Sequence, residues 1–178
     1  MLSQKVINPS SMKASAEETL FFESLAEHAH SDVSDIRHRL HSLNAVIPGL
    51  MERMYSVKRD VLVELAFNRD LVVYKMLVLS ECFPSADISS VCCKRPDILV
   101  SMDEPSIREA SQTLHEILGN HVSSAQSIDW LVEQEPMYLF THAVSEAVRT
   151  YTRVVGSDLS FLERDPKQIL TWQSRVGA

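Results

Sequence analysis

The stretch DISSVCCKRPDIL, residues Asp87–Leu99, decides the fold because two later segments of the chain align with it. These segments are SIDWLVEQEPMYL at Ser127–Leu139 and DLSFLERDPKQIL at Asp158–Leu170. Each copy opens with a small polar residue suited to cap a helix, and it ends in a charged residue, proline and an aliphatic residue. Because proline lacks an N–H group and disfavours helical backbone in its predecessor, each copy predicts a short helix that ends just before the proline.

Each copy also follows a longer amphipathic segment, so the repeating unit is predicted to be a pair of helices. The apolar residues of these preceding segments recur at helical steps: Val72, Met76, Leu79 and Phe83; Ile107, Leu114, Ile117 and Leu118; Val144, Val148, Tyr151 and Val155. A single pair cannot bury its own apolar face, and neighbouring pairs must therefore stack. The sequence predicts an all-α fold in which residues 70–178 form about three irregular, α-solenoid-like helix-pair repeats.

Residues 15–69 are predicted to form an N-terminal helical hairpin, which either stands alone or caps the first repeat. Ser15 followed by Glu18 makes a capping-box pattern and predicts a helix start near Ser15. The first arm is one long helix or two helices joined near Ser31, and Pro48 with the next glycine ends it. A second helix is predicted from about Leu50 to Asn68.

Residues 1–14 are predicted to be a disordered or transit-like tail. They are rich in serine, carry Lys5 and Lys13, and contain no acidic residue. This is the composition of an organelle transit segment without its usual arginines, although a disordered terminus is the simpler interpretation.

Composition restricts the function classes. Only 4 glycines occur in 178 residues, and they stand too far apart to build a phosphate-binding loop. The formal net charge of -7 disfavours broad attraction to a phosphate backbone. The charge is also uneven, because residues 36–75 hold seven bases against four acids whereas residues 97–146 hold nine acids and one base.

The cysteines and the hydropathy pattern bear on location. Three cysteines, two of them adjacent, favour a reducing compartment over a secreted disulfide framework. The adjacent pair, Cys92 and Cys93, lacks redox-motif spacing and is expected to pack in the core. No apolar run reaches the length of a membrane-spanning helix and no apolar leader follows the first residue, so the chain is expected to be neither membrane-spanning nor secreted.

The proline segments resemble the repeat of the mitochondrial transcription termination factor family. The residues that carry the likeness are KRPDIL at 94–99, QEPMYL at 134–139 and DPKQIL at 165–170. The text from Asp70 to Trp172 is also similar to a group of uncharacterised plant and algal repeat proteins. The resemblance implies an organellar helical solenoid, in mitochondrion or plastid, that binds nucleic acid or serves as an assembly surface. A cytoplasmic location is the alternative.

The sequence contains no strong candidate for catalysis, a metal or a cofactor. Four of the seven histidines, His28, His30, His38 and His41, lie within 14 residues. His38 and His41 share a helical face with Asp35 one turn before, but a solvated helix face explains this pattern better than a metal site does. Nucleophile-elbow and zinc-helix motifs do not occur, and the protein is predicted not to be an enzyme.

The first functional hypothesis is therefore a non-catalytic accessory or assembly subunit that contacts other proteins. Trp172, near Arg175, is the candidate partner-binding residue, whereas Trp130 and Phe140 are expected to pack in the core. The alternative is an organellar RNA- or DNA-binding factor. Its candidate residues are the bases of the region 36–75: Arg37, Arg39, Arg53, Lys58, Arg59, Arg69 and Lys75.

Overall fold

The computed structural model describes residues 9–123 and 125–171. No β-strand occurs in these residues, and the predicted all-α class is confirmed. In chain order the helices are α1 (Pro9–Ala29), α2 (Val33–Asn44), α3 (Leu50–Arg53), η1 (Met54–Ser56), α4 (Arg59–Phe67), α5 (Arg69–Cys82), α6 (Ile88–Lys94), α7 (Ile98–Ser101), α8 (Glu104–Leu118), α9 (Ala125–Gln134), η2 (Pro136–Leu139), α10 (Thr141–Val154) and η3 (Ser160–Glu163), where η marks a 3-10 helix.

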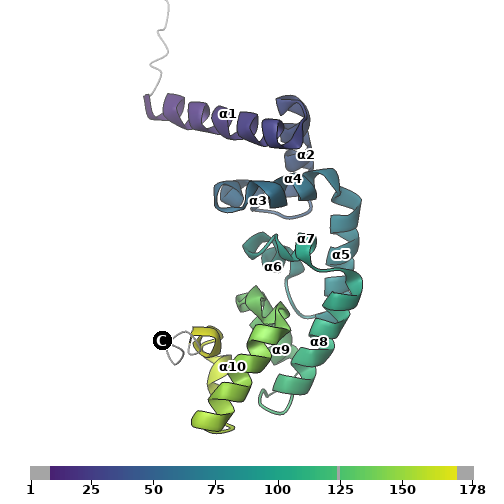
Figure 1. Ribbon diagram of the computed structural model, residues 1–178, viewed down its shortest axis with the longest axis vertical. Helices are drawn as coiled ribbons and strands as arrows, with labels where there is room; N and C mark the ends of the chain where they lie inside the picture. Colours follow the sequence, from purple (N-terminus) through teal and green to yellow (C-terminus); the bar gives the residue numbers. More distant parts are fainter. Residues whose placement is uncertain (1–8, 124, 172–178) are drawn as a thin grey trace, which may run out of the picture.

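The helices follow one another along an arch (Figure 1). The longer helices α5 and α8 form its outer side, and α10 packs against α8 in the lower part of the view. The shorter helices form a second row, in which α6 contacts α9 and α9 contacts η3. Successive long helices and successive short helices are thus in contact along the chain.

Proline ends the short helices where the sequence predicts. Helix α6 stops at Lys94 and α9 stops at Gln134, each two residues before a proline that is itself buried. The aliphatic residues behind the prolines, Leu99, Leu139 and Ile169, are buried in the core. The third copy has one residue fewer before its proline, and there the chain forms the 3-10 helix η3 instead of an α-helix.

One of the three expected helix caps is present, at Asp87, whereas the residue that caps η3 is Leu159 instead of the expected Asp158. The carboxylate of Asp87 accepts a hydrogen bond from the N–H of Ser90 at 3.1 Å, and that of Asp158 accepts one from Ser160 at 2.9 Å. The cap expected at Ser127 is wrong, because α9 already begins at Ala125. Helix α9 therefore begins earlier within its copy than the corresponding short helices begin within theirs.

The N-terminal region contains more helix breaks than expected. Helix α1 begins at Pro9, so the helix start expected near Ser15 is wrong, and residues 9–14 of the predicted tail are helical; residues 1–8 lie outside the described residues. The first arm consists of two helices, α1 and α2, which are separated at His30, where the backbone takes a left-handed φ of 50°. Of the two predicted possibilities for the first arm, the structure therefore has two helices joined near Ser31.

The single helix expected from Leu50 to Asn68 is wrong. Three short helices, α3, η1 and α4, replace it, with extended backbone at Val57 and Lys58. The hydroxyl of Ser56 donates to the carbonyl oxygen of Arg53 at 2.7 Å and satisfies a backbone group at the break. Helix α4 then packs against α1, α2 and α7, and it links the N-terminal helices to the first repeat.

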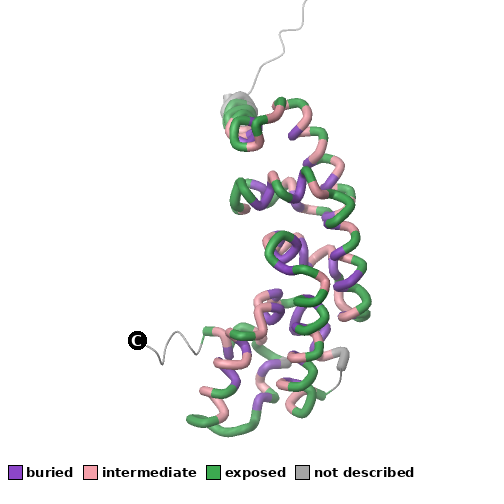
Figure 2. The backbone as a smooth tube through the Cα atoms, turned by 45° about the vertical axis from the view of Figure 1, so that its right-hand side comes forward, coloured by how far each residue is buried: buried purple, intermediate pink, exposed green. Residues whose placement is uncertain are grey.

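Buried side chains run through the units as one continuous core (Figure 2). Among the residues with described burial, only two buried side chains are charged, Lys75 and Asp129. The ammonium group of Lys75 donates to the carbonyl oxygen of Leu99 at 2.7 Å and joins α5 to α7. The carboxylate of Asp129 accepts from the N–H of Ser85 at 2.8 Å, so α9 is fastened to the loop of the preceding unit.

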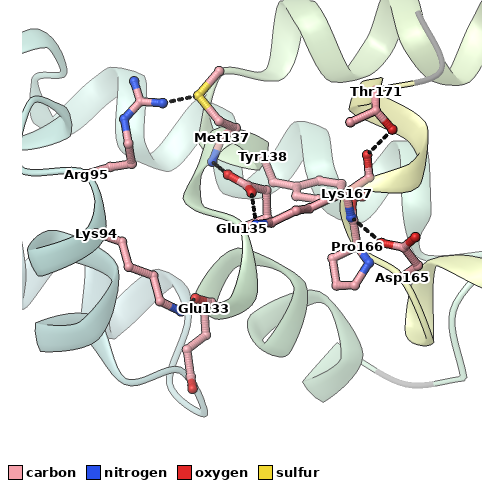
Figure 3. A network of polar contacts seen from close by, with 10 residues as sticks. All are labelled: Lys94, Arg95, Glu133, Glu135, Met137, Tyr138, Asp165, Pro166, Lys167 and Thr171. Atoms are coloured by element: carbon pink, nitrogen blue, oxygen red, sulfur yellow. Dashed lines mark hydrogen bonds and ion pairs between the residues drawn. The ribbon is translucent and has the colours of Figure 1, made fainter.

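The second and third units are joined by polar contacts at their proline turns (Figure 3). The hydroxyl of Tyr138, a fully buried residue, donates to the carbonyl oxygen of Pro166 at 2.7 Å. Burial raises the pKa of this phenol, which keeps it protonated and able to donate. Glu135, just before its proline, lies 4.0 Å from the ammonium group of Lys167, just after the next proline.

Replacing Tyr138 by phenylalanine is expected to lower the free energy of unfolding by about 1 kcal/mol, because the Pro166 carbonyl loses its partner while the packing stays. Urea unfolding followed by circular dichroism measures this change. Tyr55→Phe is the matched control, since Tyr55 is exposed. An unchanged urea midpoint for Tyr138→Phe would contradict this role.

Candidate interaction surfaces

An apolar stripe runs along the outer side of the arch at the α4–α5 junction. It consists of four large side chains at three- and four-residue steps, with exposed fractions of 41% for Phe67, 46% for Leu71, 47% for Tyr74 and 60% for Leu77. The buried residues of α5, Val72 and Leu79 among them, face the core instead. Exposed apolar side chains that occur singly are ordinary, but a contiguous row of this size is typical of a contact surface.

A hollow of about 530 Å³ adjoins the stripe and is lined by both Phe67 and Leu71. Its polar wall comes from α2, where the guanidinium group of Arg39 donates to the carboxylate of Asp35 at 2.9 Å and lies 4.4 Å from the centre of the Phe67 ring. The hydrogen bond from Arg39 lowers the pKa of Asp35. The lining of the hollow is therefore mostly polar, and Ala66, Phe67 and Leu71 supply its apolar part.

A second polar border separates the stripe from α8. The hydroxyl of Tyr74 donates to the carboxylate of Glu104, and this bond raises the pKa of Tyr74. Arg108 donates to Glu104 and to Glu81, at 2.8 Å in each case. An apolar centre with a polar rim is the usual composition of a protein–protein interface.

A basic cleft of about 410 Å³ lies at the joint between the N-terminal helices and the first repeat. Its charged lining comprises four bases, Arg53, Lys58, Lys94 and Arg95, and two acids, Asp60 and Asp97. The joint is tight, because a side chain added at Gly49 would meet the sulfur of Cys93 at 3.3 Å. Gly49 also has a left-handed φ of 86°, so glycine is required both by the backbone and by this approach.

Contacts at the proline turn hold two bases in place: Lys94, the last residue of α6, and Arg95, which follows it (Figure 3). Arg95 forms two hydrogen bonds to the carboxylate of Asp97, at 2.8 and 2.6 Å, which lower the pKa of Asp97. The same guanidinium group contacts the sulfur of Met137 and lies 5.4 Å from the centre of the Phe140 ring. Lys94 donates to the carbonyl oxygen of Glu133 at 2.5 Å, a bond that leaves its charge uncompensated.

The seven bases predicted to bind nucleic acid do not share one surface. Lys75 is 7% exposed and belongs to the core, so its prediction as a surface ligand is wrong. Arg39 and Arg69 line the hollow beside the apolar stripe, and Arg37 lies 4.6 Å from the Phe22 ring near Glu18. The remaining bases are at the joint: Arg53 and Lys58 line the basic cleft, and Lys58 and Arg59 line a neighbouring hollow.

Sequence reasoning missed two bases of the cleft and misplaced one aromatic residue. Lys94 and Arg95 stand in the KRPDIL motif, outside the base-rich region 36–75. Trp130, expected in the core, is 37% exposed. Phe140 is half-buried and lies beneath Arg95. The partner-binding candidates Trp172 and Arg175 lie outside the described residues.

The histidines and cysteines do not form a chemical centre in the described part of the chain. Within residues 9–123 and 125–171, no three His, Cys, Asp or Glu side chains gather closely enough to hold a metal ion. The three cysteines are free thiols; Cys92 is fully buried, whereas Cys82 and Cys93 are half-buried. Burial raises the pKa of Cys92 to about 12.

The chain matches no protein-family model, no curated protein and no solved structure. The likeness to the mitochondrial transcription termination factor repeat therefore stays a prediction. Among the described residues, no helix combines the length and apolar character that a bilayer crossing requires.

The reactivity of the three cysteines tests whether α6 is packed in the core. At pH 8 the Cys92 thiol, with a pKa of about 12, is a thiolate in only about one molecule in ten thousand, and it is also shielded. Iodoacetamide is expected to modify at most Cys82 and Cys93 in the native protein and all three thiols in urea, as counted by intact mass. Modification of Cys92 without denaturant would show that α6 is not packed as described.

Proposed function

We propose that this chain is a non-catalytic accessory or assembly subunit of an organellar macromolecular complex, in mitochondrion or plastid, that acts through protein–protein contacts. The observation that carries this proposal is the apolar stripe of Phe67, Leu71, Tyr74 and Leu77. Burial of apolar area is the main favourable contribution to association, and these four side chains can supply it without any rearrangement of α5. The aromatic Tyr74 and Phe67 are residue types that commonly dominate binding energy.

The surroundings of the stripe support a specific contact. Arg39 and Asp35 on one side and Arg108 with Glu81 and Glu104 on the other are already held by ion pairs. A partner that covers the stripe meets a rigid polar rim, which reduces the entropy lost on binding. Polar groups on a rim set orientation and specificity more than affinity.

The alternative, an organellar RNA- or DNA-binding factor, has less support. Its proposed bases are divided among the core, the hollow at α2 and the joint, whereas phosphate-backbone binding needs them along one continuous surface. The bases at the joint are considered below.

The role of the stripe in partner binding can be tested by replacing two of its apolar side chains with charged ones. The double variant Leu71→Glu and Leu77→Glu is expected to reduce recovery of partner proteins at least about tenfold, because two exposed apolar contacts become buried charges in the complex. The measurement is affinity capture of a tagged copy from its native cell after nuclease treatment, followed by quantitative mass spectrometry.

Val154→Glu with Val155→Glu is the matched control, since these two valines are exposed at the end of α10, away from the stripe. Both double variants should retain the circular dichroism and urea midpoint of the parent chain. Equal recovery of partners with the two variants would remove the support for this proposal.

A further inference from the structure

The basic cleft continues into a second hollow. This hollow, of about 610 Å³, is lined by Phe21, Tyr55 and Arg59, and it shares Val57, Lys58 and Asp60 with the cleft. Tyr55 is 57% exposed, and its ring centre lies 4.7 Å from that of Phe21. A single surface, here called the joint surface, therefore combines a cluster of bases with the exposed Tyr55 and the half-buried Phe21.

Positive charge dominates the joint surface although the whole chain carries a formal net charge of -7. The bases are Arg53, Lys58, Arg59, Lys94 and Arg95, and the acids are Asp60 and Asp97. Arg95 and Asp97 compensate each other through their two hydrogen bonds. The other four cations share the surface with the carboxylate of Asp60, and Lys58 also lies close enough to Asp97 to contribute to the lowered pKa of that carboxyl.

None of these four cations forms an ion pair within the part of the chain that the structure describes. The ion pairs of that part involve other bases, and the one bond from the Lys94 ammonium group goes to a backbone carbonyl. Like charges held together raise the energy of the free protein, and an anionic ligand relieves that repulsion. The joint surface is therefore complementary to a ligand with several negative charges.

The surroundings favour a short ligand over a long one. The acid-rich region that begins at Asp97 includes Glu133, whose carboxylate accepts from the N–H of Asp87 beside α6. A nucleic-acid strand that continued beyond the five bases would pass from them onto these acids, at an electrostatic cost. A short peptide with a few carboxylates needs no more basic surface than the joint provides. The Tyr55–Phe21 pair offers such a peptide an apolar contact, which a phosphate backbone does not need.

We infer that the joint surface binds a short acidic segment of a partner protein, with an apolar or aromatic side chain of that segment placed against Tyr55 and Phe21. This inference rests on the proposed role of the chain in protein–protein contacts, but it concerns a surface distinct from the apolar stripe. Arg53 belongs to α3 and Lys94 to α6, so a segment that binds both also connects the N-terminal helices with the first repeat.

Fluorescence anisotropy with the full chain tests the binding directly. The probes are a labelled glutamate-rich peptide with one central tryptophan, the same peptide with glutamine in place of glutamate, and an oligouridylate of equal negative charge. The acidic peptide is expected to bind, the glutamine peptide to bind at least about tenfold more weakly, and the oligouridylate more weakly than the acidic peptide. Tighter binding of the oligouridylate would overturn the inference in favour of nucleic acid.

Charge reversal places the binding on the joint surface. Arg53→Glu with Lys58→Glu is expected to weaken the acidic peptide at least about tenfold, whereas the control Arg153→Glu with Arg164→Glu, two exposed bases outside the joint, changes it less than about twofold. Tyr55→Ala should weaken the tryptophan peptide but not an all-glutamate peptide. Equal affinity for the two charge-reversal variants would overturn the inference.

Cys93 gives a readout that needs no charge reversal, because its side chain lines the basic cleft. Saturating acidic peptide is expected to slow alkylation of Cys93 several-fold and to leave Cys82 unaffected, as measured by peptide mass spectrometry. Unchanged alkylation of Cys93 under saturating peptide would place the peptide elsewhere and overturn the inference.

Native-cell capture separates this inference from the proposed function. Loss of partners with Leu71→Glu and Leu77→Glu, but not with Arg53→Glu and Lys58→Glu, would overturn the inference and leave the proposed function in place. Loss with the joint variant supports the inference. Retention of all partners by both variants would overturn both.

Discussion

The architecture depends on one backbone constraint, the inability of proline to continue a helix. Pro96 and Pro136 stop α6 and α9 at the same point of their units, and both rings are buried at the turn. The chain then delivers Leu99 or Leu139 into the core and starts the next long helix. Some of the polar contacts between units are made close to these turns, as with Lys94 and Glu133 or Tyr138 and Pro166. The bend that ends one helix is therefore also the place where neighbouring units recognise each other.

The all-α class and the helix ends at the prolines could be predicted because proline acts locally and without help from the rest of the fold. The break at Val57 and Lys58 could not, since residues 50–68 contain neither proline nor glycine. The prediction that Trp130 packs in the core is also wrong. The buried face of α9 consists of Ile128, Leu131 and Val132, and Asp129 beside them accepts a hydrogen bond from the backbone of Ser85, whereas Trp130 is 37% exposed.

The candidate surfaces could be predicted only in part. Arg53 and Lys58 were correctly placed among surface bases, but grouping by sequence position also included Lys75, whose ammonium group has the Leu99 carbonyl oxygen as a buried partner. Lys94 joins the cleft because α3 and α6 meet at Gly49, a contact between segments that are distant in the sequence. The apolar stripe could not be distinguished in the sequence, since its residues recur at the same helical spacing as core residues.

The contacts at the proline turns make the units non-interchangeable. The residue before each proline faces the residue after the next proline, so Arg95 meets the neutral Met137 and Glu135 meets Lys167. If the third unit followed the first directly, Arg95 would face Lys167 and two cations would be brought together. If a copy of the second unit followed itself, Glu135 would face a methionine and lose its counter-charge. Duplication or shuffling of these units would thus carry an electrostatic cost, which is small because Lys167 is exposed.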